Sequence, residues 1–183
     1  MSNTVKTSRE EIISAALAII EESGEAAASV RTVARRLGIS TQPIYREFGD
    51  MDSFMCEVKK RGYERWWEYM AGEAADQAAR YVMFAVEHGN MFDFLLRRGS
   101  GEGVKLFELK YALMPSTDII ERLMAITGLD KEKTYDLHFK LWLALHGLAV
   151  MAADGVVSPS ADEVKAFVRE TTVELAAGKR GNK

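Results

Sequence analysis

The chain has 183 residues, of which 48% are hydrophobic and 28% are charged, and its formal net charge is −3. This composition is that of an ordinary globular protein, and the slight negative charge argues against a protein that coats nucleic acid regardless of sequence. The single cysteine, Cys56, excludes an intrachain disulfide and a cluster of thiolates. We expect neither a metal nor a cofactor.

The apolar segments are short. The longest apolar-rich run, Leu141–Ala153, falls below the roughly 20 residues of a membrane span and contains His146. The first residues, Met1–Thr7, are polar and lack the apolar core of a secretory signal. We therefore expect a cytoplasmic protein without a membrane partner.

Helix signals follow one another along the chain, and the alternating pattern of strands is absent. The first helix is predicted over residues 8–23, because Ser8 and Glu11 form a capping-box pattern and Gly24 is a natural stop. The pattern therefore predicts an all-α fold. Further helices are predicted at residues 30–37, 40–47, 51–72, 74–89, 91–97, 103–113, 117–127, 131–153 and 161–177.

Two short predicted helices are joined by Gly38-Ile39-Ser40, which has the size and glycine placement of a helix-turn-helix. Ser29 is expected to cap the first helix and Ser40 the second. Ala34 is small enough to let the helices cross closely, and Ile44 points back into the same small core. This spacing predicts a helix-turn-helix near the N-terminus.

The segment is locally basic in a chain that is acidic elsewhere. Between Ser29 and Arg46 there are four arginines and no acidic residue. The second helix is expected to carry outward side chains that can bond base edges and phosphates. These side chains are Ser40, Thr41, Gln42, Tyr45 and Arg46. The alternative is a solvated helix face that happens to hold arginines.

At these residues the chain resembles a known family. The stretch from Arg9 to Met55 resembles the DNA-binding domain of the TetR family of bacterial regulators. The run from Gly38 to Tyr45 is the most specific part. The other matching residues are Ala16, Leu17, Gly24, Ser29, Val30, Arg31, Val33, Ala34, Leu37, Phe48, Asp52 and Phe54.

The resemblance implies a mechanism. A homodimer would place two recognition helices in successive major grooves of a palindromic operator. Members of this family are mostly repressors that a small molecule releases from DNA, so the resemblance implies the same role here. By position, the groove would face Ser40, Thr41, Gln42, Pro43 and Arg46, and phosphates would contact Ser29, Arg31 and Tyr45. The implied division is a DNA-binding domain over residues 1–50 and a helical domain for effector binding and dimerisation over residues 51–183.

Two residues depart from the family pattern. Glu47 stands where the family often has histidine or an aromatic residue, and Met51 stands where a lysine often contacts phosphate. Both changes remove positive charge from the DNA side. We expect weaker non-specific affinity, or compensation by Lys6 and Arg9.

The helix predicted at 131–153 is apolar around nearly its whole circumference from Leu137 onward, which is typical of a central core helix or an obligate interface. The resemblance favours a four-helix dimer interface with the last helix, and Gly147 would permit close approach. The alternative is an internal helix of a monomer. The expected interface residues are Trp142, Leu145, Leu148, Phe167, Val168 and Leu175.

The middle of the chain is rich in aromatic residues, which are more often core than pocket. Those that could line a pocket for a small apolar or aromatic effector are Trp66, Trp67, Met70, Tyr81, Phe84, Phe107 and Tyr111. The histidines His88, His138 and His146 are too scattered to suggest a metal site.

Other functions fit the sequence less well. The chain has neither a nucleophile elbow nor a zinc-protease motif, so we expect no enzyme. A helical module that binds proteins and not DNA is a second alternative. A third keeps DNA binding but makes the protein an activator.

Overall fold

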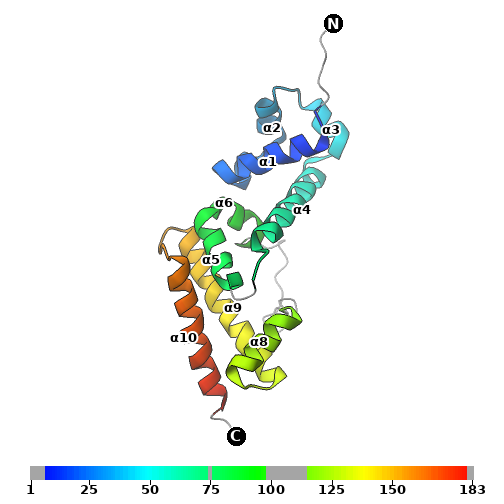
Figure 1. Cartoon of the computed structure of the whole chain (residues 1–183). Coiled ribbons are helices and arrows are strands. Elements are labelled where there is room, and N and C mark those ends of the chain that lie inside the picture. Colours follow the sequence, from blue (N-terminus) through cyan, green and yellow to red (C-terminus); the bar gives the residue numbers. More distant parts are fainter. Residues whose placement is uncertain (1–6, 74–75, 98–114, 181–183) are drawn as a thin grey trace. The chain divides into compact units, whose positions relative to one another are not determined.

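The computed structural model describes residues 7–73, 76–97 and 115–180, and these residues form helices and no strand (Figure 1). The all-α prediction is confirmed. The chain divides into two compact units, one from Met1–Tyr69 with His88–Arg98 and one from Met70–Glu87 with Gly99–Lys183. The helix predicted at 103–113 lies outside the described residues, as do Phe107 and Tyr111.

The first unit begins at the predicted capping box. The amide of Glu11 donates to Ser8 Oγ at 3.2 Å, and Glu11 Oε2 accepts from the amide of Ser8 at 2.6 Å, so the box is confirmed. The elements of this unit are α1 (Arg9–Ser23), η1 (Glu25–Ala27), α2 (Val30–Leu37), α3 (Gln42–Phe48), α4 (Met51–Met70, whose last residue belongs to the second unit), α6 (Gly89–Phe92) and the π-helical turn η3 (Asp93–Arg97).

Helix α1 is the centre of the first unit. It packs against α2 and α6. Its long apolar side chains are sequestered, with Leu17 and Ile20 both at 0% exposure. From α4, Phe54 is also fully buried, and its ring lies 4.9 Å from that of Phe48, which joins α3 to α4. Apolar burial of this kind is the main stabilising term of such a core.

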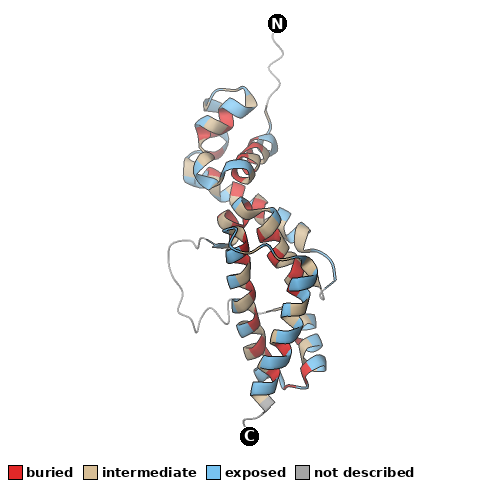
Figure 2. Cartoon of the chain, turned by 90° about the vertical axis from the view of Figure 1, so that its left-hand side faces the viewer, coloured by how far each residue is buried: buried red, intermediate tan, exposed pale blue. Residues whose placement is uncertain are grey.

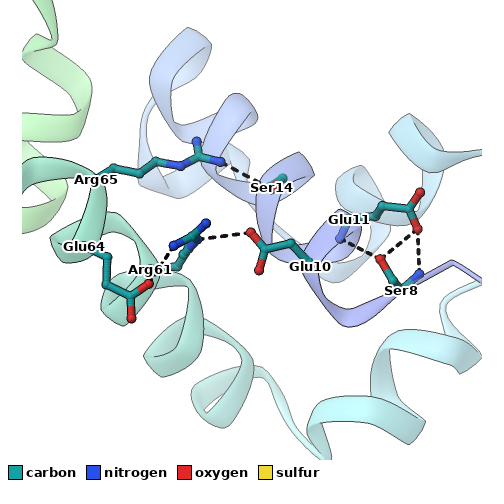
Figure 3. A network of polar contacts seen from close by, with 7 residues as sticks. All are labelled: Ser8, Glu10, Glu11, Ser14, Arg61, Glu64 and Arg65. Atoms are coloured by element: carbon teal, nitrogen blue, oxygen red, sulfur yellow. Dashed lines mark hydrogen bonds and ion pairs between the residues drawn. The ribbon is translucent and has the colours of Figure 1, made fainter. Parts of the chain in front are cut away.

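Polar contacts also connect α1 to α4 (Figure 3). Arg61 lies 3.1 Å from Glu10 on α1 and 2.8 Å from Glu64 on its own helix. Arg65 donates to the hydroxyl of Ser14 at 3.3 Å. These side chains are exposed, and an exposed ion pair contributes about 0–1 kcal/mol, so they align the two helices more than they stabilise them.

The second unit is a bundle around α9. Its elements are α5 (Gln77–Glu87), α8 (Thr117–Thr127), α9 (Lys131–Ala153) and α10 (Ala161–Arg180). Helix α9 packs against each of the other three. Its buried residues recur every three or four positions, so they form one stripe (Figure 2). They are Thr134, Leu137, Leu141, Leu145, Ala149 and Ala152.

The compact units differ from the two domains expected from the resemblance. The first unit continues past residue 50 through most of α4 and also takes in His88–Arg98. The reason is that Phe54 and Val58 complete the core of this unit with 0% exposure. The functional division at residue 50 stays a prediction. None of the helices that the structure describes is long and apolar enough to cross a membrane.

We predict that Leu137→Ala lowers the free energy of unfolding by about 2–5 kcal/mol, because the side chain is fully buried and its removal leaves a cavity. Urea denaturation followed by circular dichroism measures this change. The matched control is Ile126→Ala in the same unit, which should change stability by less than about 0.5 kcal/mol because Ile126 is 72% exposed. Equal effects of the two substitutions would contradict the assignment of the core.

Candidate nucleic-acid interface

Helix α2 begins at Ser29, as predicted. The amide of Thr32 donates to Ser29 Oγ at 3.2 Å, and the amide of Ser29 donates to Thr32 Oγ1 at 2.9 Å. The amide and the hydroxyl of Ser29 are therefore both engaged in starting the helix. A phosphate at Ser29 would have to compete with these bonds.

The turn after α2 is fixed by Gly38. Its φ of 67° is left-handed, a conformation that glycine adopts without steric penalty. The amide of Gly38 donates to Arg35 O at 3.2 Å and that of Ile39 donates to Ala34 O at 3.0 Å, which is the bond pair of a Schellman motif. The turn thus ends α2 sharply and redirects the chain into α3.

The prediction that Ser40 caps the second helix is wrong. The amides of Ile44 and Tyr45 both donate to the carbonyl oxygen of Thr41 at 3.2 Å, so α3 begins one residue later, without a side-chain cap. Pro43 lies in the first turn, as predicted, where its missing N–H is tolerated. Ser40 is exposed, and among the described residues it has no hydrogen-bond partner, so its hydroxyl is open to an external group.

Helix α3 has an apolar side and a polar side. Ile44 and Phe48 point inward, with exposures of 1% and 8%. Tyr45 is 49% exposed, and Gln42 and Arg46 are exposed as well. Thr41 and Pro43 are half-buried. Of the residues predicted to face DNA, α3 therefore presents Gln42, Tyr45 and Arg46 outward, Ser40 is exposed just before it, and Ser29 and Arg31 lie at the start of α2.

The four arginines of the basic segment do not all serve this surface. Arg36 forms two hydrogen bonds of 2.7 Å with Glu22, which join α2 to α1. These bonds lower the pKa of the Glu22 carboxyl, because they favour its charged form. The sequence does not predict this ion pair, because Glu22 lies 14 positions before Arg36 on a different helix.

The other three arginines of the segment are exposed. Arg31, Arg35 and Arg46 have no carboxylate within ion-pair distance in the described part of the chain. A DNA phosphate can bind an arginine that has no ion pair without breaking one, because it displaces only water and mobile ions. The basic character of the surface therefore rests on these three residues.

Arg9, which is expected to compensate for the missing positive charge, forms ion pairs within the chain. It lies 3.3 Å from Glu47 at the end of α3 and 3.1 Å from Glu57 on α4. Its charge is thus already balanced by two carboxylates. Lys6 lies outside the described residues.

The residues expected at a dimer interface are spread over both sides of their helices. Leu145 is only 7% exposed and faces its own bundle, and Leu175 packs onto a buried cluster with Leu129 and Leu137. Trp142 stacks on His146 with ring centroids 4.9 Å apart. Leu148 and Val168 are half-buried, and Phe167 is 37% exposed.

Most of the exposed apolar side chains of α9 and α10 are not among the interface residues predicted from the sequence. Leu143 and Met151 are 40% and 44% exposed, and on α10 Val173 is 57% exposed. Gly147 lies between the first two at helical spacing, and no atom lies within 4 Å of where its Cβ would be. Residues 143, 147 and 151 share one face of α9 because they are four positions apart, but the buried residues 141, 145 and 149 have the same spacing, so the sequence pattern alone does not tell the two faces apart.

The residues expected in an effector pocket have varied surroundings. Trp67 is 64% exposed and Phe84 is 4% exposed, while Trp66 and Met70 are half-buried. In the second unit, the hydroxyl of Tyr81 lies 2.7 Å from His146 Nδ1. The effector pocket stays a prediction.

Comparison with known proteins agrees with this geometry. Residues 12–58 match the family model described as bacterial regulatory proteins, tetR family. A curated relative, described as an uncharacterized HTH-type transcriptional regulator of Mycobacterium tuberculosis, is 22% identical over 97% of this chain and 84% of its own length.

Solved structures share the fold. A TetR-like transcriptional regulator from Rhodococcus sp. RHA1 aligns over 100% of both chains with a TM-score of 0.60 and 16% identity. A second transcriptional regulator from the same source aligns over 94% of this chain and 97% of its own, with a TM-score of 0.59 and 18% identity.

The short helix pair, its left-handed glycine turn and the exposed polar side of α3 define a DNA-binding helix-turn-helix protein. Together with the match of residues 12–58 to the tetR family model and the curated relative, they support a transcriptional regulator of TetR type.

We predict that Gly38→Ala lowers the free energy of unfolding by about 1–2 kcal/mol, because a Cβ is strained at a φ of 67° although the space around it is open. Thermal unfolding measures the loss. Gly38→Asn should lose less, because asparagine enters this conformation more readily than alanine. If alanine proved as stable as glycine, the left-handed turn would be wrong.

Proposed function

We propose that the chain is a homodimeric repressor that binds a palindromic operator through α3 and is released by a small apolar or aromatic effector. It would act in the cytoplasm and catalyse no reaction. The observation that carries the proposal is the exposed polar side of a seven-residue helix whose opposite side is buried. A helix that presents polar groups from a rigid support is what major-groove recognition requires.

The proposed contacts follow from exposure and chemistry. Gln42 and Arg46 carry bidentate hydrogen-bonding groups of the kind that read adenine and guanine, and Ser40, Thr41 and Pro43 lie beside them. Tyr45, Arg31 and the start of α2 at Ser29 would bind phosphates. Arg35, which is exposed on the same helix as Arg31, would add a phosphate contact.

The dimer would form through the exposed apolar residues of α9 and α10. Leu143, Gly147 and Met151 offer a flat face on α9, and Phe167 and Val173 offer exposed apolar area on α10. Gly147 would let a helix of the second copy approach closely. The buried Leu145 would support this surface from behind.

Selection of duplexes from a random pool, followed by titration of the enriched sequence at several salt concentrations, tests the proposal. A dimer should enrich a palindrome, with half-sites about one helical turn apart, and bind it with steep salt dependence. Release by a metabolite extract would support the effector. If the pool gave no enriched sequence and the protein bound no DNA even at low salt, the chain would be a protein-binding helical module.

We predict that Tyr45→Ala weakens binding to all sequences about fivefold, because a phosphate hydrogen bond of roughly 1 kcal/mol is lost. Arg46→Ala should instead relax the preference at one base position, by about 1–3 kcal/mol of discrimination. Competition titration against operator variants separates the two effects. The control is Arg122→Ala on α8, an exposed arginine remote in sequence from α3, which should leave binding unchanged. Unaltered affinity of both α3 variants would contradict the recognition helix.

We predict that Leu143→Glu and Met151→Glu each convert the dimer into a folded monomer, because a partly exposed position tolerates the charge until a second copy covers it. Light scattering and circular dichroism measure mass and folding together. Leu145→Glu should instead unfold the bundle, because the side chain of Leu145 is only 7% exposed. A dimer that survived both surface substitutions would place the interface elsewhere.

A further inference from the structure

Arg9 on α1 also lies beside α3, but it is bound by two carboxylates. The Nη1 atom of Arg9 donates to the carbonyl oxygen of Glu47 at 3.4 Å and to Oε1 of the same residue at 3.3 Å. Its Nη2 atom lies 3.1 Å from Oε2 of Glu57. The guanidinium also lies over the ring of Phe48, 4.6 Å from the centroid, where the negative face of the ring attracts it.

We propose that Glu47 and Glu57 keep Arg9 off the DNA backbone, so that Arg9 is a latent phosphate contact whose availability these two carboxylates set. The inference rests on the proposed function, in which α3 lies against DNA. It assigns affinity-limiting roles to two residues that touch neither a base nor a phosphate.

The position of Arg9 supports the inference. Its guanidinium contacts the backbone of α3 at the residue after Arg46, so it lies at the edge of the surface proposed to meet DNA. Its side chain is nevertheless 44% exposed. A guanidinium has five N–H donors in a fixed plane, and donors that the carboxylates leave unoccupied can reach solvent.

The net negative charge around Arg9 explains why a phosphate does not bind it in the native arrangement. Two carboxylates around one guanidinium leave a net charge of about −1, which repels the DNA backbone. The side chains of Glu47 and Glu57 are 43% and 37% exposed, so each ion pair is weak alone and exchangeable. Arg9, Glu47 and Glu57 line a cleft of about 430 Å³ together with Asp52. Among the described residues, however, Arg9 forms its ion pairs with Glu47 and Glu57.

Both carboxylates must be removed to release Arg9, because either one alone can still form an ion pair with it. The test variant is therefore the double substitution Glu47→Gln and Glu57→Gln, which keeps side-chain size and hydrogen bonding. The probe is a short duplex of mixed sequence without a palindrome, which reports phosphate contacts alone. Its affinity is measured from 50 to 200 mM salt.

One added phosphate contact steepens the slope of log K against log salt by about 0.9. The proposed dimer carries two copies of Arg9, so the double variant should gain about 12-fold more affinity than the wild type when salt falls over this range. Each single variant should stay near the wild-type slope. Arg9→Gln alone should also leave the slope unchanged, since Arg9 makes no phosphate contact in the wild type.

Two controls separate release of Arg9 from a change in net charge. Adding Arg9→Gln to the double variant should return the slope to the wild-type value. The matched control is Glu10→Gln with Glu64→Gln, which removes two carboxylates that hold Arg61, one turn further along α4 (Figure 3). That pair changes the net charge equally and should not steepen the slope.

A gain that persisted without Arg9, or that appeared equally in the control pair, would overturn the inference, because charge alone would then explain it. A folded double variant with the wild-type slope would overturn it too, while leaving the proposed function intact. If the wild type bound neither this duplex nor any selected sequence, the DNA-binding proposal would fail and the inference with it.

Discussion

The recognition surface depends on the burial of two side chains. Helix α3 has seven residues, and isolated helices shorter than about 12 residues are marginal in water. It is held because Ile44 and Phe48 are buried and the ring of Phe48 meets that of Phe54 on α4. The left-handed turn at Gly38 then fixes the direction in which α3 leaves α2. The orientation of Tyr45 and Arg46 follows from these constraints.

The arginines in this region differ in whether a carboxylate of the chain already binds them. Arg36 is used to join α2 to α1, and Arg9 is balanced by carboxylates of α3 and α4. Arg31, Arg35 and Arg46 remain available to an external anion. A chain with a net charge of −3 can thereby carry a basic surface without strong non-specific attraction to nucleic acid.

Local signals in the sequence predicted most of the elements. The capping box at Ser8, the cap at Ser29 and the bounds 117–127 and 131–153 are confirmed, because they depend on neighbouring residues. The pairing of Arg36 with Glu22 could not be predicted, since it depends on how α2 lies against α1. On α9, apolar residues on both sides hid the distinction between buried Leu145 and exposed Leu143, which only packing against α5, α8 and α10 resolves.

The most direct test of the central claim, that the outward side of α3 contacts DNA, is amide hydrogen exchange of the full chain with and without its selected duplex. Binding through α3 should slow exchange in residues 38–48 and at the start of α2, where the duplex would exclude water and suppress local opening. The bundle of α8, α9 and α10 should change little. Protection confined to α8, α9 and α10, with α3 exchanging as in the unbound protein, would contradict the account.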